Sequence, residues 1–81
     1  MNIELYKRAA RARDLPPPGL RRGDVVTPVE PGRAPDGTEG FAIEVFNALG
    51  ETIAVTCVSV TDLEALTEDE VLSIRRLKQA A

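Results

Sequence analysis

Alternating apolar and polar residues in the middle of the chain give the clearest structural signal. Residues 41–46 alternate with a period of two, which predicts a half-buried strand with Glu44 facing solvent. Residues 47–50 then predict a hairpin turn, and residues 51–60 are rich in β-branched side chains that favour a second strand. Because both faces of the second strand are partly apolar, we expect it to lie in the centre of a sheet.

A third strand is predicted upstream of this hairpin, after a stretch rich in proline. Residues 25–30 are rich in valine and threonine at alternating positions, which favours a strand. Pro28 cannot donate a ladder hydrogen bond, so the strand must be an edge strand or must be bulged at that position. The three successive prolines at 16–18 exclude a helix there and predict a stiff turn closed by Leu15 and Leu20.

The two ends of the chain carry other patterns. Residues 7–14 mix alanine with arginine, and this segment is compatible with either a helix or a strand. Residues 62–66 predict one helical turn, and residues 68–79 predict an α-helix that begins with the capping-box pair Thr67 and Glu70. Acids at the start of this helix and basic residues near its end suit the helix dipole.

Short strands, tight turns and a single helical turn predict a mainly β fold. We expect residues 1–66 to form a small SH3-like barrel and residues 67–81 to add a C-terminal α-helix. A helix of about twelve residues is marginal alone in water, so it must pack on the barrel, on a second copy or on a partner. The candidate partner-binding residues on this helix are Val71, Leu72, Ile74 and Leu77.

Charge is distributed unevenly along the 81 residues, whose formal net charge is −3. Residues 1–23 carry six basic and two acidic side chains, and residues 24–70 carry eleven acids against one arginine. Residues 71–81 carry three basic side chains and no acid. This order predicts either that the ends fold back near the acidic middle or that they meet a charged partner.

The residue types that catalysis and metal binding require are scarce. The chain has no histidine, and its single cysteine, Cys57, is expected to be a buried and inert thiol. The acids at 68–70 are explained by a helix start, and no loop has the spacing of a calcium-binding or phosphate-binding motif. We therefore expect no enzyme activity, no catalytic or metal-binding residues and no cofactor.

Nucleic acid is the alternative class of partner. A basic patch on the N-terminal edge could be formed by Arg8, Arg11, Arg13, Arg21 and Arg22. Nucleic-acid sites of small barrels combine basic grooves with stacking aromatics, whereas this chain is acidic over residues 24–70 and has only three aromatic residues. The sequence therefore favours a protein partner over nucleic acid.

The sequence also resembles a known family. Its order R-D-L-P-x-x-G-L-x-x-G-D-V, followed by G-E-T-I-A-V, is similar to a small, mostly bacterial family known only as a domain of unknown function. The matching segments lie within residues 8–66 and are Arg13-Asp14-Leu15-Pro16, Gly19-Leu20, Gly23-Asp24-Val25, Glu44-Val45-Phe46 and Gly50-Glu51-Thr52-Ile53-Ala54-Val55. The resemblance implies a single SH3-like barrel without catalytic residues, and an antitoxin-like or accessory role.

These observations predict a non-enzymatic protein-binding module, in the form of an antitoxin-like or accessory subunit. A nucleic-acid-binding regulator is the alternative function. The expected partner is a protein of unknown identity, or a second copy bound through the C-terminal helix. No apolar run approaches the roughly 18 residues that span a membrane. The N-terminal residues also lack the apolar core of a secretory signal, so we expect a cytoplasmic protein without membrane contact.

Overall fold

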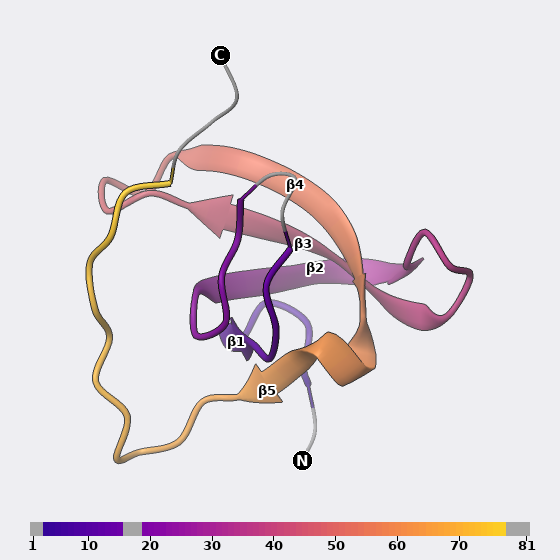
Figure 1. The fold of residues 1–81 in the computed structure, drawn as a ribbon, viewed down its shortest axis with the longest axis horizontal. Coiled ribbons are helices and arrows are strands. Elements are labelled where there is room, and N and C mark those ends of the chain that lie inside the picture. The colour runs from indigo at the N-terminus through magenta and orange to yellow at the C-terminus, as the bar shows by residue number, and fades with distance from the viewer. Residues whose placement is uncertain (1–2, 16–18, 78–81) are drawn as a thin grey trace.

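The chain folds into one antiparallel sheet with the strand order β4-β3-β2-β1-β5 (Figure 1). The computed structural model describes residues 3–15 and 19–77. Its strands are β1 (Ala9–Arg11), β2 (Val25–Arg33), β3 (Glu39–Phe46), β4 (Thr52–Ser59) and β5 (Leu63–Ala65). A 3₁₀ helix, η1 (Val60–Asp62), leads directly into β5.

Strand β2 lies between β1 and β3 and pairs with both of them. Its first residues, Val25 and Val26, pair with β1, whereas the residues from Thr27 onwards pair with β3. The register with β3 shifts between Pro28 and Glu30, so of the two arrangements predicted for Pro28, an edge position or a bulge, the strand adopts the bulge. Pro28 lacks an amide hydrogen, but its carbonyl accepts a hydrogen bond from the Tyr6 amide at 2.7 Å.

The hydrophobic core lies between the strands and the loop that precedes β2. Its buried cluster consists of Leu20, Val26, Ile43, Val45, Val58 and Leu63. Ile43 is 0% exposed and Phe41 packs against the cluster, which confirms the face predicted to point inward in β3. The Leu15 amide donates to the Leu20 carbonyl at 2.8 Å, so these leucines close the turn as expected, while the prolines at 16–18 lie outside the described residues.

Strand β4 lies at one end of the strand order, so the prediction of a central strand is wrong. Val58 and Ser59 at the end of the strand are buried, but Val55 is 62% exposed and Cys57 is exposed as well. The prediction of a buried Cys57 is therefore wrong too. β-Branched residues fit any half-buried pleated surface, and their abundance in β4 did not require burial of both faces.

Two short strands, β1 and β5, form in the segments where the sequence allowed a helix (residues 7–14) or predicted a helical turn (residues 62–66). Residues 9–11 form β1, which pairs with both β2 and β5, so the N-terminal segment is a strand. The helical turn predicted at 62–66 is wrong for residues 63–65, which are extended; the one turn of helix near this place is η1, where the Ser59 side chain accepts from the Thr61 amide. The chain then becomes extended and forms β5.

The predicted C-terminal α-helix is absent, so the expected SH3-like barrel with a terminal helix is not what the chain forms. The structure is mainly β, and its described residues contain no α-helix. We call residues 66–77 the C-terminal strap. The Thr67 amide does donate to the Glu70 carboxylate at 2.6 Å, as in a capping box, but after that turn the chain continues without helix or strand and follows a long arc (Figure 1). An extended residue advances about 3.3 Å and a helical residue only about 1.5 Å, so the extended strap reaches contacts that a helix would miss.

Candidate functional site

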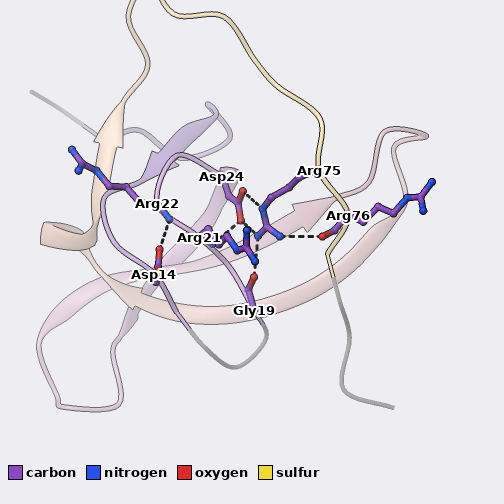
Figure 2. Close-up of polar contacts among 7 residues, drawn as sticks. All are labelled: Asp14, Gly19, Arg21, Arg22, Asp24, Arg75 and Arg76. Carbon is purple, nitrogen blue, oxygen red and sulfur yellow. Dashed lines mark hydrogen bonds and ion pairs between the residues drawn. The ribbon is translucent and has the colours of Figure 1, made fainter.

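Arg75 holds the end of the strap against the loop between β1 and β2 (Figure 2). Its Nε donates to Asp24 Oδ1 at 2.8 Å, and its Nη2 donates to Asp24 Oδ2. The same Nη2 also donates to the Gly19 carbonyl at 2.9 Å. The planar guanidinium thus grips both carboxylate oxygens, which is the strongest geometry for an arginine–carboxylate pair.

The loop itself fixes the position of Asp24. The Arg21 amide donates to Asp24 Oδ2 at 2.7 Å, and the Arg11 amide donates to the Asp24 carbonyl at 2.8 Å. Partial burial alone would raise the pKa of Asp24, but the hydrogen bonds from Arg75 and Arg21 outweigh it and hold this pKa below its ordinary value. The same contact with Asp24 raises the pKa of Arg75.

The four apolar residues predicted to bind a partner do not share one face of the strap. Val71 is 91% exposed, Ile74 is 92% exposed and Leu72 is 50% exposed. Leu77, in contrast, packs against the core cluster. The strap is therefore anchored at its end by Arg75 and Leu77, and it presents Val71 and Ile74 to solvent.

A pocket of about 460 Å³ separates the strap from the sheet. Part of its lining is a row of cross-strand neighbours, Val25, Ala10 and Glu64, contributed by β2, β1 and β5. Strap residues 70–73 line the pocket as well. In Figure 1 the strap accordingly forms a wide arc from the end of β5, outside the outline of the strands. The strap spans the sheet without packing closely on it.

The five arginines predicted as a basic patch do not form one surface. Arg11 is 1% exposed, and its guanidinium is inside the fold. Arg13 donates to the carboxylate of the last residue of η1 at 2.8 Å. Arg8 is exposed, and Arg21 and Arg22 are exposed in the pocket-lining loop, where Figure 2 shows the Arg22 side chain extending away from Arg75.

Groups suited to metal binding are not assembled in the described part of the chain. No cluster of three or more histidine, cysteine, aspartate or glutamate side chains there could hold a metal ion. Cys57 is a free, exposed thiol. Among the same residues, no helix has the length and apolar character needed to cross a membrane.

The contact between Asp24 and Arg75 is the feature of the site that the sequence motifs did not reveal. These residues are 51 positions apart, and no local pattern links them. The only signal was the order of charges, which predicted that the basic end folds back near the acidic middle. Arg75 does fold back to Asp24, so this prediction is confirmed for that pair.

Comparisons with known proteins identify no relative of this chain. The chain matches no family model, and neither curated proteins nor solved structures show significant similarity to it. The resemblance to a bacterial family of unknown function therefore stays a prediction. The function has to be argued from the chain's own residues.

Proposed function

We propose that the protein is a non-enzymatic protein-binding module, with an accessory or antitoxin-like role, and that the C-terminal strap is its binding element. The observation that carries this proposal is the exposure of Val71 and Ile74, both above 90%, on a segment that is tethered at both ends. One tether is β5, and the other is the pair Arg75 and Leu77.

The energetics of association favour such a segment. Burying an exposed valine or isoleucine against a partner contributes roughly 1.5–3 kcal/mol for each side chain. A chain held at both ends loses less conformational entropy on binding than a free tail does. The strap therefore combines apolar contact area with partial preorganisation.

The direct test is capture of proteins from the native cell with two matched variants. Val71→Thr combined with Ile74→Thr replaces exposed apolar surface of the strap with hydroxyl groups, at two positions that do not pack in the core. Val55→Thr makes the same kind of change on β4, at a position that is 62% exposed. We expect the strap variant to lose its partner at least tenfold, and the β4 variant to retain it, with unchanged melting temperatures. Equal capture by both variants would refute the proposal.

The nucleic-acid alternative has less support. Arg11 is buried and Arg13 is paired with η1, which leaves Arg8, Arg21 and Arg22 from the predicted patch. The cytoplasm is the compartment that we propose, because thiols are kept reduced there and the exposed Cys57 suits that environment.

A further inference from the structure

We propose that the partner captured by the strap is a second copy of this chain, and that two copies exchange their straps. In the exchanged dimer, Arg75 and Leu77 of each chain occupy on the other chain the positions that they occupy here on their own. This inference rests on the proposed use of the strap as the binding element. Exchange of an identical segment is a low-cost route to a dimer, because the contacts already exist within one chain.

The chain carries both halves of the contact. The plug is the guanidinium of Arg75, and the socket is the Asp24 carboxylate together with the Gly19 carbonyl. Arg75 links the strap to the loop before β2 through its contacts with the Asp24 carboxylate and the Gly19 carbonyl. A second copy is therefore a partner that offers a socket of the right charge and geometry.

The middle of the strap is free to change its path. Residues 67–74 are all exposed, and the pocket keeps part of this stretch away from the sheet. The strap can therefore redirect its end to another molecule at the cost of few contacts. Where two straps cross between the subunits, Val71 and Ile74 of one strap can cover those of the other, a contact that the single chain cannot make.

Charge complementarity supports the same occupant. The strap begins with Glu68, Asp69 and Glu70, all of them exposed. The socket loop exposes Arg21 and Arg22. Within one chain Glu70 lines the same pocket as Arg21 and Arg22. In an exchanged pair, the acidic start of each strap can face the basic loop of the other chain in the same way, so that opposite charges meet between the two copies.

Charge reversal on each half of the contact tests the exchange. Arg75→Glu makes an acidic plug, and Asp24→Arg makes a basic socket, so neither variant can dock its strap on itself or on an identical copy. In an equimolar mixture, the acidic side chain at position 75 of one variant can pair with the basic side chain at position 24 of the other, and Arg75 of the second variant can pair with Asp24 of the first. Opposite charges therefore meet only between two different chains. We expect each variant alone to remain at the monomer mass of 8.7 kDa, and the mixture to form a species of twice that mass in light scattering.

A chain that carries both reversals is the control for folding, because its plug and socket match again within one molecule. It should melt close to the unmodified protein. If this control folds and the mixture nevertheless stays monomeric at concentrations approaching about 1 mM, the typical effective concentration of a short tether, the exchange is excluded.

A second variant decides the question if Asp24→Arg does not fold. Deletion of residues 71–73, which follow the turn at residues 67–70, shortens the strap by up to about 10 Å, so that Arg75 should no longer reach its own socket. The shortened chain should be a dimer at all concentrations where the unmodified chain is a monomer. A folded, monomeric deletion variant would overturn the inference.

The two proposals fail in different ways. If the mixture and the deletion variant both stay monomeric while capture still depends on Val71 and Ile74, the strap binds a different protein and only the exchange is wrong. If capture is also independent of Val71 and Ile74, the proposed function is wrong as well.

Discussion

Replacing Arg11 with methionine should stabilise the protein. Arg11 is 1% exposed, and its Nε and Nη1 atoms have no hydrogen-bond partner among the described residues. Desolvation lowers the pKa of Arg11, and the nearby carboxylates of Asp62 and Asp24 oppose this shift only in part. The guanidinium nevertheless stays charged at every ordinary pH, so the fold carries a buried charge that forms no ion pair among residues 3–15 and 19–77 and is only partly compensated by the nearby carboxylates.

The expected gain follows from the two unpartnered donors. A buried donor left without a partner costs about 1–3 kcal/mol, so removing two of them should raise the free energy of unfolding by at least about 2 kcal/mol. Methionine keeps an unbranched apolar stem, and a void of about 20 Å³ left by the guanidinium would cost only about 0.5 kcal/mol. For a domain of this size, a net gain of about 1.5 kcal/mol raises the melting temperature by about 6–12 °C.

Thermal and urea unfolding at pH 7 measure this effect, and Arg13→Met is the matched control. Arg13 is also an arginine next to Asp62, but its side chain is 70% exposed, so its loss should change the stability by less than about 1 kcal/mol. A lower melting temperature for Arg11→Met than for the unmodified protein would show that the guanidinium stabilises the fold, and the reasoning would be refuted.

Three further predictions concern the sheet, the anchor and the surface. Gly40→Ala should destabilise the protein by several kcal/mol, because its Cβ would lie 1.8 Å from the Val58 carbonyl oxygen in β4; Gly32→Ala, with its nearest contact at 3.3 Å, should shift the urea midpoint less. Because the anchor holds the pKa of Asp24 below its ordinary value, the stability that this group contributes is present above about pH 4 and is lost as the pH falls below it. The NMR chemical shifts of the Arg75 and Leu77 amides should therefore move towards their unfolded values in acid before those of the sheet do, and Asp24→Asn should abolish that dependence. Binding to DNA or RNA should be no tighter than the non-specific range of about 10⁻⁴ to 10⁻⁶ M at physiological salt, and tight binding that is lost on Arg21→Ala with Arg22→Ala would contradict this.

The sequence predicted the parts of the fold that depend on local patterns. The alternation in β3, the hairpin at 47–50 and the bulge at Pro28 all follow from side-chain period and backbone chemistry, and all are present. The turn at 47–50 also has the expected local contacts, since the Asn47 side chain accepts from the Leu49 and Glu51 amides at 2.9 Å. These features need no information from distant residues.

The errors arose where distant residues decide the structure. The edge position of β4 depends on which strands pair, and its β-branched residues are compatible with either location. The burial of Arg11 could not be predicted either, because residues 7–14 contain several arginines among alanines and no local pattern distinguishes Arg11 from the others. At the candidate site, the sequence supplied Val71, Leu72, Ile74 and Leu77 as candidate partner-binding residues on a helix. It did not supply the anchor between Arg75 and Asp24, which joins residues far apart in the chain.

The strap shows which interactions overcome local helix propensity. An isolated helix of about twelve residues has a free energy of formation close to zero in water, so even weak tertiary contacts can decide its conformation. The hydrogen bonds of Arg75 to a charged carboxylate contribute about 1.5–3 kcal/mol, and partial burial of Leu77 adds about 1–2 kcal/mol. The extended form therefore prevails by a few kcal/mol, although Thr67 and Glu70 still make the contact of a helix start. Because the strap adds no strand to the sheet, breaking its anchor should release the strap without unfolding the rest of the chain.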